Sequence, residues 1–204
     1  MKTYDKIYIN GEWVPAVGTG AIEVVSPYSQ EVIGSVPKGN EEDVNKAVAA
    51  AKAAFPAWAA TSVEERAVYI EKLGDALAAR EAEIGSTISQ EMGMPVTFSR
   101  MIQAGLAINI TKTYPDILRN YKFDEELGTT TVAKEPIGVC SFITPWNYPL
   151  YLIIAKVMPA LAAGCTMVLK PSSDTPLNAY IFAEIVEEKT AKVKEIGPRG
   201  KSET

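Results

Sequence analysis

Two short polar segments each follow an apolar run that has the character of a buried strand. Pro145–Pro149 follows Gly138–Thr144, and Lys170–Pro176 follows Cys165–Leu169. The apolar stretch Pro149–Ala163 between them predicts a helix, and this spacing predicts a βαβ unit with two parallel strands. Ligands of open parallel sheets bind at the carboxyl ends of the strands, so both segments are candidate ligand-binding loops.

Each segment also has a plainer interpretation. In Pro145–Pro149 the prolines could stiffen the chain, the tryptophan could fill space and the asparagine could turn the backbone, while Lys170 could be a solvated lysine. Because both polar segments lie on neighbouring βα units, we favour a binding site over the interpretation that each segment has only a structural role.

The composition excludes several kinds of catalytic site. The 204 residues include no histidine and two cysteines, and the net charge is −5. Without histidine there is no Ser–His–Asp triad, no Cys–His pair and no His-ligated metal, and we expect no metal site. Acid–base chemistry would fall to carboxylates, lysine, tyrosine or water. The acidic balance argues against a nucleic-acid partner.

The two cysteines are expected to be structural. Cys140 and Cys165 lie in the apolar strand-like segments, where burial raises a thiol pKa and makes the thiol inert. Two cysteines without a CxxC pair fit a reduced, cytoplasmic protein. The sequence has no secretory signal, and its longest apolar stretch is shorter than the about 20 residues of a membrane span. It has no GxGxxG, and Gly200–Ser202 lacks the first glycine of a P-loop.

The rest of the chain predicts further strands and helices in an α/β fold. Hydrophobic periodicity and caps place strands at Lys6–Asn10, Ile22–Ser26, Glu31–Val36 and Thr129–Lys134, the last one exposed. They place helices from Asn40 to near Pro56, from Ser62 onward, and over Ala82–Met92, Val96–Leu118 and Thr175–Glu188, with Pro176 in the first turn of the last.

Several motifs, in order and in spacing, resemble the NAD(P)-dependent aldehyde dehydrogenase superfamily. The resemblance runs from about residue 6 to about residue 188 and implies a partial Rossmann-like parallel sheet with flanking helices, plus a protruding β-strand arm. The motifs that carry it are Asn10–Trp13, Phe55–Trp58, Glu91–Pro95, Phe142–Pro149, Pro159–Cys165 and Leu169–Ser172.

The resemblance implies a reaction and assigns roles in it. In the family an enzyme cysteine attacks the aldehyde, hydride passes to the nicotinamide, and water hydrolyses the thioester. Asn147 matches the asparagine whose side-chain amide donates to the developing oxyanion. The residues implied in binding NAD or NADP are Ile143, Thr144, Pro145 and Trp146, which line the cofactor, and Lys170, Ser172 and Ser173 near the adenosine ribose.

Ser173 bears on the choice of cofactor. It matches a position that is often glutamate in strict NAD users, where the carboxylate repels a 2′-phosphate. A neutral serine removes that repulsion, so we expect the lineage to tolerate NADP as well as NAD. The alternative is that Ser173 is indifferent to the cofactor.

The resemblance divides the chain into three parts. Residues 1–122 and 137–188 match the N-terminal part of the NAD(P)-binding domain, 123–136 match the oligomerisation arm, and 189–204 form an atypical tail. Family members are more than twice this length, and their catalytic cysteine, general-base glutamate and substrate domain lie further along. We therefore expect a chain truncated before the nucleophile and inactive alone. Full-length relatives are expected to be homo-oligomers that act on a small aldehyde.

Alternative interpretations stay open. The chain could be a non-catalytic fragment that binds a nucleotide or a full-length relative, or the product of a broken gene. Glu195–Gly197 faintly resembles the family's general-base motif, although Pro198–Arg199 breaks it. The sequence does not indicate which aldehyde the lineage oxidises.

Overall fold

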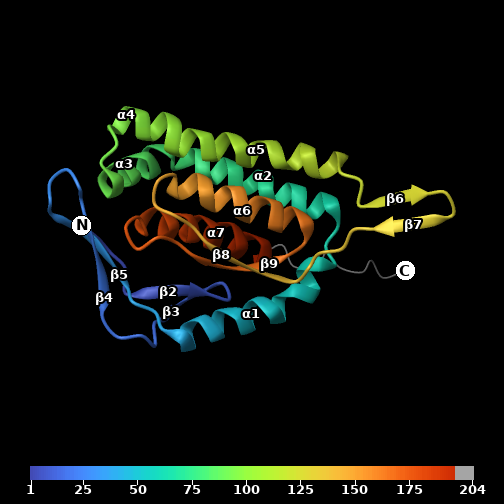
Figure 1. The fold of residues 1–204 in the computed structure, drawn as a ribbon, viewed down its shortest axis with the longest axis horizontal. Coiled ribbons are helices and arrows are strands. Elements are labelled where there is room, and N and C mark those ends of the chain that lie inside the picture. Colours follow the sequence, from blue (N-terminus) through green and yellow to red (C-terminus); the bar gives the residue numbers. More distant parts are fainter. Residues whose placement is uncertain (196–204) are drawn as a thin grey trace.

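The computed structural model describes residues 1–195, and it confirms the mixed α/β class (Figure 1). Strand β5 pairs with β1 in parallel and with β4 antiparallel, while β2 and β3 form a hairpin. At the hairpin turn Asn10 and Gly11 have φ values of 56° and 78°, the positive values that an Asn-Gly turn favours. The amino-terminal strands are β1 (Lys2–Thr3), β2 (Lys6–Ile9), β3 (Glu12–Pro15), β4 (Ala21–Val25) and β5 (Val32–Pro37).

The main core lies among helices. Asn40 and Ser62 cap α1 and α2, as predicted, and both caps are capping boxes, although α1 continues past Pro56 to Ala59. Isoleucine and leucine side chains from α2, α3, α6 and α7 are fully buried together. The long helices are α1 (Glu41–Ala59), α2 (Val63–Ala79), α3 (Glu81–Met92), α5 (Gly105–Asn120), α6 (Pro149–Ala163) and α7 (Leu177–Glu195). None of the helices described combines the length and the apolar character needed to span a bilayer.

The helix predicted over Val96–Leu118 is present, but it is not α-helical throughout. The segment contains a short helix α4 (Val96–Phe98), a π-helix (Ser99–Ala104) and then α5. The π-helix packs closely on α3, because a Cβ on Gly85 would lie 2.7 Å from the Arg100 Cα atom. An apolar pattern does not separate an α turn from a π turn, so periodicity gave no sign of the change.

The predicted βαβ unit is present. Strand β8 (Val139–Ile143) leads through α6 to β9 (Thr166–Lys170), and the two strands are parallel. The prediction that both strands are buried on both faces is wrong, because their residues are half-buried or exposed. Within residues 1–195 β8 and β9 pair only with each other, so neither has a neighbour on its outer edge. Helix α1 packs against β9, where the Thr166 hydroxyl donates to the Ala51 carbonyl at 2.7 Å.

The exposed Thr-rich strand has a partner within this chain. It is β7 (Thr130–Ala133), which pairs antiparallel with β6 (Asp124–Leu127), and every residue of both strands is exposed. Figure 1 shows this hairpin projecting from one end of the helical layer. The sequence predicted one strand here, because the charged β6 lacks an alternating apolar pattern.

The last helix differs from its prediction at both ends. Pro176 lies just before α7, which begins at Leu177, and the helix continues past Glu188 to Glu195. The first part of the predicted tail is therefore helical. Residues 196–204, with most of the faint general-base motif and all of the P-loop-like segment, lie outside the described residues.

Candidate functional site

The structure brings the two predicted loops together at one edge of the β8–β9 pair. The parallel register places Ile143 opposite Lys170, and these are the last residues of the two strands. The backbone N–H of Thr144 donates to the Lys170 carbonyl at 3.2 Å, so the loops begin side by side. The predicted adjacency of the two segments is confirmed.

The loop after β8 presents apolar surface to solvent. Ile143 is 71% exposed and Trp146 is 52% exposed, whereas Thr144 is buried. Pro145 and Asn147 are exposed as well. Large apolar side chains beside polar groups in a loop form the kind of surface that a flat organic ligand covers.

The same loop leads directly into α6. Pro149 occupies the first turn of α6, and no side chain of residues 1–195 caps that end of the helix. Uncapped backbone N–H groups at a helix N-terminus attract anionic groups such as phosphates. Behind the loop, the side-chain amide of Gln103 donates to the Asn147 carbonyl at 3.2 Å.

The loop after β9 is polar. Lys170 and Ser173 are exposed, and the Lys170 ammonium donates to the Pro171 carbonyl at 3.3 Å. The Ser172 hydroxyl donates to the Asp174 carboxylate at 3.3 Å and accepts from the Asp174 backbone N–H at 3.3 Å. This loop therefore offers one cation, two hydroxyls and one carboxylate to a ligand at the strand edge.

Glu91 of α3 holds the start of α7, directly after that loop. Its buried carboxylate accepts from the Leu177 N–H at 2.5 Å, and from the Asn178 N–H at 3.3 Å and side-chain amide at 2.9 Å. Burial raises the Glu91 pKa to about 7, although these hydrogen bonds and the charge of Lys2 act in the opposite direction. The carboxylate replaces the side-chain cap that α7 would otherwise need.

Glu91 and Gln103 were missed as site residues. Glu91 carried a signal, since it begins one of the motifs quoted above, but nothing in the sequence places it at the start of a helix 86 residues further on. Gln103 carried no such signal in the sequence, because a single glutamine in an apolar helical pattern is usually interpreted as a surface residue.

The cysteines are not placed as nucleophiles. Cys165 is buried between α6 and β9, one residue before the strand that was expected to contain it. Cys140 is half-buried in β8, and burial and the neighbouring Cys165 raise the pKa of its thiol. A thiol with a raised pKa is mostly protonated at neutral pH and is a weak nucleophile.

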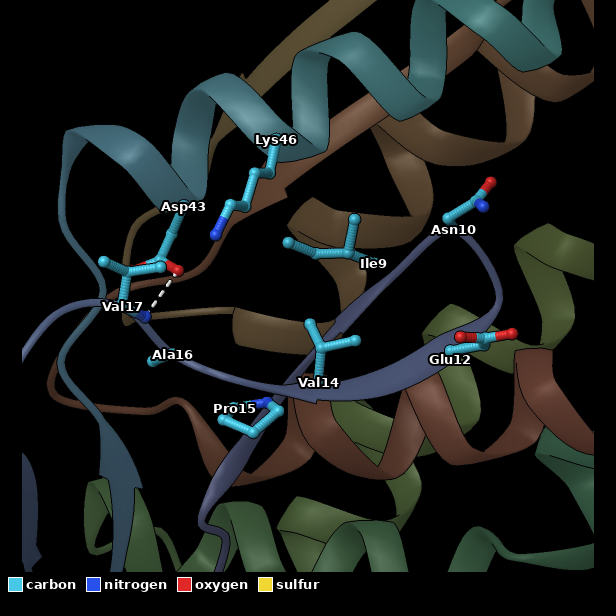
Figure 2. A pocket seen from close by; sticks show the side chains of 9 residues that line it. All are labelled: Ile9, Asn10, Glu12, Val14, Pro15, Ala16, Val17, Asp43 and Lys46. Atoms are coloured by element: carbon cyan, nitrogen blue, oxygen red, sulfur yellow. Dashed lines mark hydrogen bonds between the residues drawn. The ribbon is translucent and has the colours of Figure 1, made fainter.

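A cavity of about 580 Å³ lies elsewhere, between the β2–β3 hairpin and α1 (Figure 2). One of its two carboxylates, Asp43, accepts backbone N–H groups from Val17, Gly18 and Asn40 at 2.8–3.0 Å. These bonds outweigh the effect of desolvation and lower the pKa of Asp43. Because that carboxylate already ties a loop to the start of α1, we assign it a structural role and place the candidate site at the strand ends.

Comparisons with known proteins identify the family. The model of the aldehyde dehydrogenase family matches residues 13–194. The chain belongs to this family. The match begins and ends later than the range of about 6 to 188 expected from the sequence motifs.

Several relatives of this aldehyde dehydrogenase chain are close in sequence or structure. A 3-succinoylsemialdehyde-pyridine dehydrogenase from a Pseudomonas species is 46% identical over 189 residues. A solved structure of aldehyde dehydrogenase C from Pseudomonas syringae, a variant in complex with NAD+ and octanal, is 45% identical with a TM-score of 0.89, over 91% of this chain and 38% of that one. An aldehyde dehydrogenase from Bartonella henselae is 36% identical with a TM-score of 0.90, over 93% and 41%.

The chain corresponds to only part of its relatives. The Pseudomonas relative is matched over 92% of this chain but over 40% of its own length. The matched part of the chain has the fold of the family. The activity of a whole enzyme is considered below as a proposal.

Proposed function

We propose that this chain carries the oxyanion donor and part of the dinucleotide site of an NAD(P)-dependent aldehyde dehydrogenase, which oxidises an aldehyde to a carboxylic acid. The observation that carries the proposal is the register of Ile143 beside Lys170, which brings both candidate loops to one edge. The NAD+ and octanal named for the Pseudomonas syringae structure support the cofactor and the substrate class.

Asn147 is the proposed catalytic residue of this chain. When a nucleophile adds to an aldehyde carbon, negative charge develops on the oxygen, and a fixed neutral amide N–H stabilises it. Removal of one such donor typically costs about 3–4 kcal/mol of transition-state stabilisation. Asn147 is exposed at the strand edge, so its amide is accessible to a substrate bound there.

The residues at the strand edge suit a dinucleotide. Bound NAD(P)+ supplies the hydride acceptor of the reaction. The apolar faces of Ile143 and Trp146, with Thr144 and Pro145, fit one half of the cofactor. Lys170, Ser172 and Ser173 supply a cation and hydroxyls for the ribose of the other half.

The isolated chain is expected not to oxidise aldehydes. Cys165 is buried, and Cys140 is half-buried with a thiol whose pKa is raised by burial and by the neighbouring Cys165, so neither side chain is the exposed, activated thiol of a nucleophile. Turnover of an aldehyde with NAD+ by the purified chain would contradict this expectation.

The proposal is tested by following the three tryptophans during a cofactor titration. The chain is labelled with 5-fluorotryptophan, and its ¹⁹F spectrum is recorded with increasing NAD+ or NADP+. We expect the Trp146 signal, assigned with Trp146→Phe, to shift with a Kd on the order of 1 mM, because half a site binds weakly. The signals of Trp13 and Trp58, which lie on other elements, serve as internal controls. A Trp146 signal that stays in place up to tens of millimolar would remove the support for a dinucleotide site.

The projecting β6–β7 hairpin favours a second role, in oligomerisation. Leu127 is 63% exposed and Val132 is 39% exposed on an otherwise polar hairpin with free edges. In full-length relatives we propose that this hairpin joins copies of the enzyme. Light scattering on the chain and on Leu127→Asp tests the contact, and equal masses at every concentration would count against it. The reduced, cytoplasmic location stays a prediction that rests on two free cysteines.

A further inference from the structure

A buried glutamine connects the π-helix to the loop that carries Asn147. Gln103 is 0% exposed, and its side-chain nitrogen donates to the Asn147 carbonyl at 3.2 Å across 44 residues of sequence. Thr144 joins the loop to β9 at one end, and Gln103 holds it in the middle.

The π-helix holds Gln103 in place from behind. At its start the buried Ser99 hydroxyl donates to the Gly85 carbonyl of α3 at 2.7 Å. The missing side chain of Gly85 lets the backbone at Arg100 approach closely. Gln103 lies inside this π-helix, so the contact of the π-helix with α3 holds the backbone from which the Gln103 side chain reaches the Asn147 carbonyl.

The glutamine is costly as a packing residue. Its side-chain oxygen is buried and has no hydrogen-bond partner among the described residues. An unsatisfied buried acceptor destabilises a fold, and a methionine would fill similar space without that penalty. We therefore interpret the Gln103 side-chain amide as a group that orients the loop after β8 rather than as one that fills space in the core.

We propose that Gln103 is the positioning residue for Asn147. Its hydrogen bond fixes the peptide carbonyl of Asn147, and through the backbone it fixes the direction in which the Asn147 side chain donates. The inference rests on the proposed role of Asn147 as the oxyanion donor. Gln103 does not touch substrate or cofactor in this scheme, so it acts only through the loop.

The sequence allows the hydrogen bond to be observed at one carbonyl carbon. Asparagine followed by tyrosine occurs twice in the chain, at Asn147–Tyr148 and at Asn120–Tyr121. A chain labelled with ¹³C-carbonyl asparagine and ¹⁵N tyrosine therefore gives two cross-peaks in an HNCO spectrum. The second peak comes from the end of α5 and is an internal control.

The decisive variant is Gln103→Met, which removes the donor and keeps most of the volume. We expect the Asn147 carbonyl signal to move upfield while the Asn120 signal stays in place. Thr111→Val is the matched control, because Thr111 is also fully buried but donates within its own helix, to Ala107 at 2.8 Å. It is expected to leave both peaks unchanged. An unmoved Asn147 peak in folded Gln103→Met, or an equal shift in Thr111→Val, overturns the proposal.

A measurement on the unaltered chain covers the case in which Gln103→Met does not fold. The three glutamines are labelled with ¹⁵N in the side chain. A scalar coupling is then sought between a glutamine side-chain nitrogen and the Asn147 carbonyl carbon, across the hydrogen bond. A coupling from one glutamine supports the proposal, and its absence contradicts it. Neither experiment uses a nucleotide, so failure of cofactor binding at Trp146 and failure of the Gln103 contact are separate results.

Discussion

The two loops at the strand edge are held by different chemistry. A buried carboxylate, Glu91, accepts three hydrogen bonds at the start of α7, directly after the loop that follows β9. The loop after β8 is held from behind by one bond between neutral groups, from Gln103 to Asn147. Three hydrogen bonds to one buried group are expected to hold a segment more firmly than one bond.

The difference predicts which half of the site is rigid. The loop proposed to bind ribose has a buried anchor with several bonds, and Thr175, Pro176 and Leu177 beside it are buried. The loop with the proposed oxyanion donor has Trp146 and Asn147 in solvent, and besides the backbone bond at Thr144 its anchor among the described residues is one side chain, Gln103. Segments with few buried contacts open most readily, so we expect the loop after β8 to be the more mobile of the two.

The largest expected effect is that of Glu91→Leu. The variant leaves the backbone N–H groups of Leu177 and Asn178 without their acceptor in a buried place, and the Asn178 side-chain amide keeps only the Thr175 carbonyl, which costs on the order of 3–5 kcal/mol of unfolding free energy. Urea unfolding measures the loss, and hydrogen exchange at Leu177 and Asn178 locates it. Glu91→Gln keeps one acceptor oxygen and is expected to lose less. Equal stability of Glu91→Leu and the unaltered chain would show that the carboxylate is no anchor.

The second effect is a pH dependence with an unusual sign. Burial raises the Glu91 pKa to about 7 from its ordinary value of 4.5, so the folded chain holds this proton more tightly than the unfolded chain. Stability should therefore fall as pH rises from about 4.5 to about 7, by roughly 3 kcal/mol, and stay level above pH 7. The chain has no histidine to titrate in this range.

The low pKa of Glu83 and a matched variant isolate the contribution of Glu91. Arg80 and Lys2 lower the Glu83 pKa to about 2, so Glu83 affects stability only below about pH 4.5, where its contribution is lost as the pH falls. Urea midpoints measured from pH 4.5 to pH 8 should decline in the unaltered chain and flatten in Glu91→Gln. A profile that keeps the same slope in Glu91→Gln would assign the titration to another group.

A smaller loss is expected for Gln103→Met. Removal of one neutral hydrogen bond costs about 1 kcal/mol, and removal of the unpaired side-chain oxygen gives part of that back. Unfolding free energy should change several-fold less than in Glu91→Leu, whereas hydrogen exchange at Trp146 and Asn147 should become faster. If Gln103→Met were as destabilising as Glu91→Leu, the contrast between the two loops would be lost.

Glu91 and Gln103 show which features of the site could not be predicted from the sequence. Three features were predictable, because each depends on local pattern or on a general rule of parallel sheets. They are the strand–helix–strand order, the caps at Asn40 and Ser62, and the adjacency of the two loops. Glu91 and Gln103 were not, since each acts on a partner far along the chain. The π-helix was also missed, because it follows from the close contact at Gly85 rather than from the local pattern.

The smallest expected effect concerns the choice of cofactor at the better-anchored loop. Ser173 was expected to tolerate a 2′-phosphate, but the exposed carboxylate of Asp174 lies next to it and is tied to Ser172. If Ser173 lies near the ribose, Asp174 should repel the phosphate of NADP+ through a solvent-screened interaction of about 0.5–1 kcal/mol. Asp174→Ala should therefore favour NADP+ over NAD+ by roughly two- to five-fold in the ¹⁹F titration, and more at low salt. Asp124→Ala makes the same change in net charge on the distant β6–β7 hairpin and should leave the ratio unchanged. An equal change in both variants would assign the preference to overall charge, and no change in either would leave Ser173 and Asp174 without a part in cofactor choice.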